Sequence, residues 1–145
     1  MQIVTREPIG VIACIIPFNF PCDLYDQKVA PALMMGNAAL VLPSSDNPLT
    51  LMKLTEMLVE AGVPDGVIQC VTAPGAVKST AVADPRVHLV TLTGSTEVGI
   101  DTAQDKPSTG YPLVCSEPAS DRIYQGMQIL SLVPSAYYLS DSRWY

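Results

Sequence analysis

A continuous apolar run near the start of the chain places the strongest constraint on its fold. Residues 9–16 read Ile-Gly-Val-Ile-Ala-Cys-Ile-Ile, with no polar side chain and many β-branched residues. A strand with one face in water alternates apolar and polar residues, so this run predicts a strand covered on both faces. Similar runs follow at residues 38–42, 67–72 and 88–93. We therefore expect one sheet that is buried on both sides.

Helical patterns separate these runs. The clearest helix begins after Asn47, which can cap the first free N–H groups, and Pro48 suits the first helical position. Apolar residues recur at spacings of three and four up to Ala61, and Gly62 ends the pattern. Further helices are expected at about residues 24–35, at 75–83 and after Gly94. This alternation predicts an α/β fold, a Rossmann-like parallel sheet with helices on both faces.

The loops at the carboxyl ends of the strands are the expected place for a ligand. They comprise residues 17–23, 43–48, 73–75 and 94–96.

The amino-acid composition changes near residue 105. The last 41 residues hold five of the six tyrosines and the only tryptophan. We therefore divide the chain into an incomplete dinucleotide-binding domain, 1–104, and a poorly defined tail, 105–145. A short strand at 113–115 and a helix at 123–133 are the elements expected in the tail.

Charge and cysteine usage exclude several classes of function. Lys plus Arg number 8 against 14 Asp plus Glu, a net charge of −6 without a basic tract, so neither nucleic acid nor an anionic membrane is an expected partner. The run at 9–16 is too short to span a bilayer, and Glu7 beside Arg6 is unlike a signal peptide. Four widely spaced cysteines and one histidine give little support for a metal site. The cysteines are expected to be buried and reduced, which fits the cytoplasm.

The segment from Gly94 to Gly99 follows a predicted strand and opens a predicted helix. Free backbone N–H groups and the positive end of the helix dipole make such a position a ready anion site. It matches neither the P-loop nor the GxGxxG pattern. The simpler interpretation is that Gly94 permits a tight turn and Ser95 caps the helix.

Two prolines bracket an amide in the segment Pro17-Phe18-Asn19-Phe20-Pro21. The rings stiffen the loop and fix where Asn19 points, and a held amide can donate to a developing oxyanion. The alternative is that Asn19 bonds to its own loop. Lys28 and His88 are expected to be an ordinary solvated lysine and an ordinary edge or loop histidine.

Several segments, in order, are similar to those of a known enzyme family. They are Arg6-Glu7-Pro8-Ile9-Gly10-Val11, Pro17-Phe18-Asn19-Phe20-Pro21, Lys28-Val29-Ala30-Pro31-Ala32-Leu33-Met34-Met35-Gly36-Asn37, Glu60-Ala61-Gly62-Val63-Pro64-Asp65-Gly66 and Thr93-Gly94-Ser95-Thr96-Glu97-Val98-Gly99. Together they resemble the aldehyde dehydrogenase superfamily over about residues 6–104.

The resemblance implies a role for particular residues. Asn19 stands where the family stabilises an oxyanion, and Lys28 aligns with a lysine of the proton relay. The resemblance implies cofactor contacts, to NAD or NADP, at Ile16, Pro17, Phe18, Ser44, Pro74, Gly75, Gly94 and Ser95. A small aldehyde would be the substrate of the complete enzyme, and relatives form homo-oligomers.

Two departures from the family pattern matter. Leu42 and Ser45 replace the lysine and glutamate that hold the adenosine ribose, so the choice between NAD and NADP is open and coenzyme A is a possible acyl acceptor. The family's general base and nucleophilic cysteine have no counterpart here, because Cys115 lies in an unrelated motif. We therefore expect a fragment with a foreign tail, explicable by a reading-frame slip near Gln104. A non-catalytic nucleotide-binding or interaction module and a non-functional truncated product are the alternatives.

Overall fold

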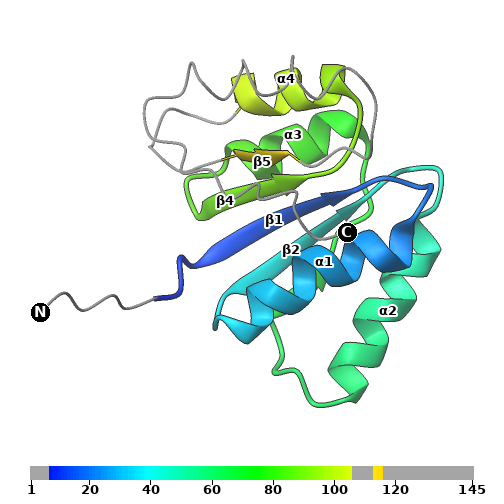
Figure 1. Cartoon of the computed structure of the whole chain (residues 1–145), viewed down its shortest axis with the longest axis vertical. Coiled ribbons are helices and arrows are strands. Elements are labelled where there is room, and N and C mark those ends of the chain that lie inside the picture. The colour runs from blue at the N-terminus through cyan, green and yellow to red at the C-terminus, as the bar shows by residue number, and fades with distance from the viewer. Residues whose placement is uncertain (1–6, 106–112, 116–145) are drawn as a thin grey trace, which may run out of the picture.

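A parallel sheet forms the centre of the fold in the computed structural model, which describes residues 7–105 and 113–115. Its strands are β1 (Val11–Ile16), β2 (Ala38–Pro43), β3 (Ile68–Cys70), β4 (Val87–Leu92) and β5 (Leu113–Cys115). They lie in the order β3-β2-β1-β4-β5, and every neighbouring pair is parallel (Figure 1). The predicted parallel sheet is confirmed, and so is the short strand expected at 113–115.

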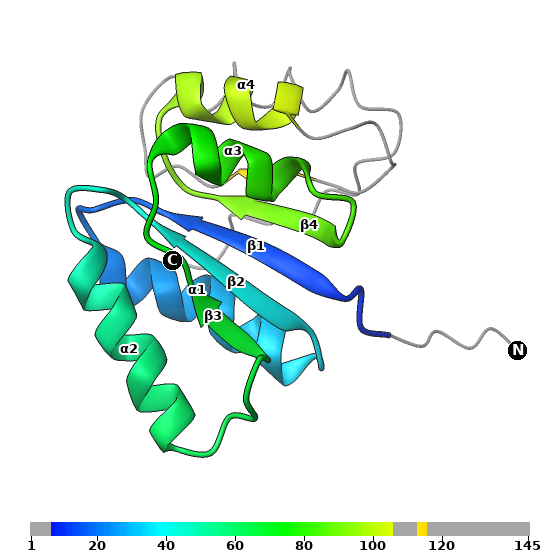
Figure 2. The ribbon, with the colours of Figure 1, turned by 180° about the vertical axis from the view of Figure 1, so that it is seen from behind.

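Helices cover both faces of the sheet, as predicted. They are α1 (Pro21–Met34), α2 (Pro48–Glu60), α3 (Gly75–Ala83) and α4 (Thr96–Asp105). Helices α1 and α2 lie on one face and α3 and α4 on the other, which the opposite views of Figures 1 and 2 show. Within the described residues, no helix is long and apolar enough to cross a membrane.

The apolar character of β1 follows from its central place. Its side chains alternate between two cores: Ile12, Cys14 and Ile16 face α1 and α2, whereas Ala13 packs in the opposite core with Val82 of α3. Because both faces are covered, the strand has no position at which a polar side chain would meet water.

Some bounds differ from those expected. β1 begins at Val11 rather than Ile9, because Gly10 has a φ of +116°, outside the extended region. α1 begins at Pro21, earlier than the predicted start at Leu24, since proline suits the first helical turn. The third strand is confined to Ile68–Cys70. The helix expected at 123–133 lies outside the described residues.

Asn37 joins the beginning of β1 to the end of α1. Its Oδ1 accepts hydrogen bonds from the backbone N–H groups of Ile9 (2.6 Å) and Gly10 (3.0 Å). Its Nδ2 donates to the carbonyl oxygen of Ala32 at 3.2 Å, and the residue is buried. The side chain therefore holds the backbone that leads into the central strand.

The pairing of β1 with β4 contains an irregularity at His88. Val11 pairs with Val87 and Ile12 with Leu89, so His88 has no opposite residue. The imidazole Nδ1 accepts a hydrogen bond from the N–H of Val11 at 3.2 Å. The expectation of an ordinary edge or loop histidine is wrong, because β4 lies between β1 and β5 and the ring completes the pairing.

Candidate functional site at the carboxyl edge of the sheet

The direction of the chain across the sheet changes at β1. From β1 the chain runs outward through β2 to β3, and then crosses to β4 on the other side of β1. Ligands of open α/β sheets bind outside the carboxyl ends of the strands at such a switch point. The candidate site therefore lies where the loop 17–20 after β1 meets the loop 93–95 after β4.

Backbone hydrogen bonds hold two neighbouring loops to the end of β1. The N–H of Thr93 donates to the carbonyl oxygen of Ile15 at 3.2 Å, and the N–H of Ser44 donates to that of Ile16 at 2.9 Å. The loops after β2 and β4 are thus fixed on either side of the loop that carries Asn19. The topology brings the predicted loops to one edge.

The four helices begin at this same edge, because each follows its strand after a short loop. The first turn of a helix presents free N–H groups and the positive end of its dipole, which favours an anion. At α4 the predicted cap is confirmed, since Ser95 Oγ accepts a hydrogen bond from the N–H of Val98 at 3.4 Å. The predicted cap at α2 is wrong: Asn47 Oδ1 accepts instead from the Thr50 hydroxyl at 2.8 Å.

Gly75 and Gly94 lie at the starts of α3 and α4, where the lack of a side chain leaves the backbone N–H groups accessible to a ligand. Neither has a positive φ, in contrast to Gly10 and Gly36, and a Cβ at either position would meet nothing within 4 Å. Neither a left-handed backbone conformation nor a steric contact with another residue therefore requires glycine at these two positions. Open backbone N–H groups suit the close approach of a ligand, and in this respect the residues fit the pyrophosphate of a dinucleotide.

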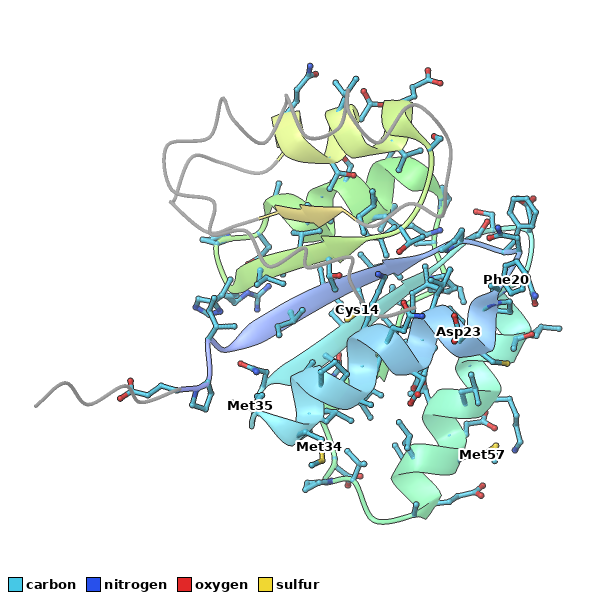
Figure 3. The ribbon with its side chains drawn as sticks, in the orientation of Figure 1. Cys14, Phe20, Asp23, Met34, Met35 and Met57 are labelled. Carbon is cyan, nitrogen blue, oxygen red and sulfur yellow. The ribbon has the colours of Figure 1, made fainter. Side chains whose placement is uncertain are left out.

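Asn19 and Phe18 are exposed in the loop after β1. Within residues 7–105 and 113–115 the Asn19 side chain forms no hydrogen bond, so it is not bound to its own loop. The Phe18 ring is 56% exposed. In Figure 3 the neighbouring Phe20 marks this edge, and Met34 lies at the far end of α1. The loop therefore presents an amide donor and an aromatic ring at the switch point.

Lys28 lies on α1 with its side chain buried, which corrects the expectation of a solvated lysine. It faces the core beside Cys14 of β1. Burial raises the pKa of the Cys14 thiol to about 12, and the nearby charge of Lys28 offsets only part of this effect. Cys14 therefore remains a thiol at neutral pH and is not a nucleophile.

The remaining predicted residues occupy different environments. The side chain of Ile16 is 1% exposed and belongs to the core, so only its backbone can meet a ligand. Pro17 and Ser44 are half-buried, and Ser44 Oγ donates to Asp46 Oδ2 at 3.3 Å. Pro74, the residue before α3, is exposed.

Two features were missed from the sequence. Cys22 is exposed on the first turn of α1, contrary to the expectation of buried cysteines. Lys78 of α3 donates from Nζ to the carbonyl oxygen of Pro43 at the end of β2. The contact joins residues 35 positions apart, and no spacing in the sequence signals it. Among the described residues, no group of three or more His, Cys, Asp and Glu could hold a metal ion.

Comparison with known proteins gives a consistent result. A family model described as the aldehyde dehydrogenase family matches residues 1–117, past residue 104 and through β5. The 2,5-dioxopentanoate dehydrogenase of Saccharolobus solfataricus is 46% identical over 95 residues, which cover 65% of this chain and 20% of the relative. The NADP(+) succinate-semialdehyde dehydrogenase of Escherichia coli is 42% identical over 98 residues, 67% of this chain and 20% of that enzyme.

The solved structures agree with the sequence relatives. An NAD-dependent aldehyde dehydrogenase from Sinorhizobium meliloti superimposes with a TM-score of 0.74 at 34% identity, covering 77% of this chain and 22% of that one. The chain therefore spans about a fifth of the length of the curated relatives it matches.

Proposed function

The chain belongs to the aldehyde dehydrogenase family, and we propose from this premise that it forms the dinucleotide-binding and oxyanion-stabilising part of an NAD(P)-dependent aldehyde dehydrogenase. The observation that carries the proposal is the open backbone at Gly75 and Gly94, where two helices begin beside the switch point. In the complete enzyme the substrate would be an aldehyde, oxidised to an acid or to an acyl-CoA. We propose a cytoplasmic, homo-oligomeric enzyme of which residues 1–104 hold most of the cofactor contacts.

The start of α4 would hold the pyrophosphate. The N–H groups that follow Gly94 have no intrahelical acceptor, and they meet an anion without help from any particular side chain. Ser95 keeps the first turn closed through its bond to the Val98 N–H. Pro74 and Gly75 place a second helix start at the same edge, while Pro17, Phe18, Ser44 and the backbone of Ile16 would line the rest of the cofactor.

Asn19 would act on the substrate. Its exposed amide can donate a hydrogen bond to the oxygen of an aldehyde on which negative charge develops when a nucleophile attacks. The bound nicotinamide, when present, supplies the hydride acceptor. Lys28 would serve as a relay for a proton, and its burial against β1 makes it a fixed rather than a mobile amine.

We propose that these 145 residues do not oxidise aldehydes on their own. Covalent catalysis of this kind needs a thiolate and a base together. Burial raises the pKa of both Cys14 and Cys70. His88 Nδ1 already accepts a hydrogen bond from the Val11 N–H, so this nitrogen does not serve as a base for a cysteine thiol.

A matched pair of substitutions tests the cofactor site. Asn and Asp are both good helix caps, so Ser95→Asn and Ser95→Asp differ chiefly by one negative charge at the proposed pyrophosphate position. Calorimetric titration of the full chain with NAD and NADP should show binding to the unchanged chain and to Ser95→Asn, and at least tenfold weaker binding to Ser95→Asp. Equal affinity of the two variants would place the cofactor elsewhere, and binding of neither cofactor to the unchanged chain would overturn the proposal.

A further inference from the structure

The ammonium group of Lys78 is held at the carboxyl end of β2. Lys78 belongs to the first turns of α3, and its Nζ donates a hydrogen bond to the carbonyl oxygen of Pro43, the last residue of the strand. The residue is half-buried, and this burial lowers the pKa of its amine, with the charge of Asp46 acting in the opposite direction. The position of the cation is therefore set by the backbone of β2 and by the packing of α3.

Much of the hydrogen-bonding capacity of this cation is unused. An ammonium group has three N–H donors, and Pro43 takes one of them. In the part of the chain that the structure describes, the ion pairs within 4 Å are Lys53–Glu56 and Arg86–Asp84, and neither includes Lys78. The charge of Lys78 is therefore available to an anionic ligand at this edge.

In a dinucleotide-binding sheet, residues near the end of the second strand distinguish NAD from NADP. An acidic residue in this region accepts a hydrogen bond from the ribose 2′-hydroxyl of NAD, whereas a cation accommodates the 2′-phosphate of NADP. Here Ser44 and Ser45 follow the strand directly. The first acid is Asp46, which is exposed and whose carboxylate accepts a hydrogen bond from the Ser44 hydroxyl. The cation thus lies at the strand end, and the acid lies farther along the loop.

We propose that Lys78 selects the cofactor of this chain by binding the 2′-phosphate of NADP, so that NADP binds more tightly than NAD. The inference rests on the proposed function, because it assigns a specificity-determining residue to the same dinucleotide site. A new charge-assisted hydrogen bond between an ammonium and a phosphate corresponds to a preference of about tenfold to a hundredfold. Asp46 reduces this preference, because its carboxylate repels the same phosphate.

Calorimetric titration of the full chain with NADP and NAD measures the preference directly. Adenosine 2′,5′-bisphosphate and adenosine 5′-monophosphate repeat the comparison with ligands that differ only in the 2′-phosphate. We expect NADP and the bisphosphate to bind at least tenfold more tightly than their partners. Lys78→Met, which keeps the length of the side chain, should abolish the ratio, and Lys78→Arg should retain it.

Two further variants separate recognition from structure. Lys53→Met removes an exposed lysine of α2 and should leave the ratio unchanged. Asp46→Asn should raise the preference for NADP, because it removes a repelling charge without changing shape. An Asp46→Asn variant that instead loses affinity for NAD alone would show that Asp46 binds the 2′-hydroxyl, and would overturn the inference.

The other outcomes are equally distinct. Equal binding of NAD and NADP to the unchanged chain would overturn the inference. So would a Lys78→Met variant that weakens the binding of both cofactors by the same factor, because Lys78 would then only hold α3 to the end of β2. In either case the proposed function stands. Failure of both cofactors to bind would overturn the proposed function itself. A preference that depends on Lys78 and not on Lys53 would establish the assignment.

Discussion

Gly10 and His88 occupy space that no larger pair could share. A Cβ atom on Gly10 would lie 2.6 Å from Nδ1 of His88, closer than Cβ atoms approach other heavy atoms in proteins. The same Nδ1 accepts the hydrogen bond from the N–H of Val11, the next residue along the chain. The missing side chain of Gly10 is therefore what allows the imidazole to complete the pairing between β1 and β4.

Gly10→Ala should destabilise the chain for two reasons. The φ of +116° is strained for any residue with a side chain, and the added Cβ displaces His88. Gly62→Ala is the matched control, because Gly62 has a φ of +106° but meets nothing within 4 Å. We expect about 1–2 kcal/mol for Gly62→Ala and a further 1–3 kcal/mol for Gly10→Ala, measured by urea denaturation. Equal losses would show that the contact with His88 contributes nothing.

Asn37→Ala should cost about 2–4 kcal/mol, because it leaves the N–H groups of Ile9 and Gly10 without their acceptor in a partly buried place. Asn47→Ala serves as the control. The Asn47 side chain bonds only to a neighbouring threonine hydroxyl. Removing it should therefore lower the free energy of unfolding by less than about 1 kcal/mol. Similar midpoints in urea for both variants would contradict the role assigned to Asn37.

Stability should fall with rising pH in a way that depends on Cys14. The thiol ionises near pH 9.0 in the unfolded chain, but its pKa is about 12 when folded. The group therefore contributes its full stability below pH 9.0 and loses it as pH rises toward the folded pKa. The slope is up to about 1.4 kcal/mol per pH unit above the unfolded pKa. Denaturation at pH 8, 9 and 10 should show a shallower slope for Cys14→Ala than for the unchanged chain.

The cysteines should differ sharply in their reactivity. Cys22 is exposed and Cys14 is buried, and burial protects a thiol both by access and by its raised pKa. Ellman's reagent should label Cys22 in the folded chain and Cys14 only after unfolding, with Cys22→Ser as the control for assignment. Rapid labelling of Cys14 in the folded chain would mean that α1 does not cover β1 as described.

The full chain should not reduce NAD or NADP in the presence of a panel of short aldehydes. Burial raises the pKa of the Cys14 and Cys70 thiols, so neither is a thiolate at neutral pH. Absorbance of the reduced nicotinamide is the readout. Steady turnover that disappears in both Cys22→Ser and Asn19→Ala would show that this chain has catalytic machinery of its own.

The sheet could be predicted from the sequence because burial on both faces leaves a local signature, and the runs at 9–16 and 38–42 carry it. The start of α1 was harder to predict from the sequence, since Pro21 suits a rigid loop as well as a first helical turn. The loops of the candidate site were placed by topology, because every carboxyl end of a parallel sheet meets one edge.

Contacts between distant residues could not be predicted in this way. The bonds of Asn37 to β1 span 28 and 27 residues, the bond from Val11 to His88 spans 77, and that from Lys78 to Pro43 spans 35. Nothing local distinguishes Lys78 from an ordinary surface lysine, because its role depends on where α3 packs against β2. Only the folded chain shows which polar side chains complete the backbone and which stay free for a ligand.

The short outer strand β3 affects how copies of the molecule can associate. It spans three residues at the edge of the sheet, whereas β1, β2 and β4 span six each. A neighbouring chain that tried to extend the sheet there would find only a few unpaired backbone groups, too few for a stable lateral ladder. Lateral growth into fibrils through this edge is therefore disfavoured.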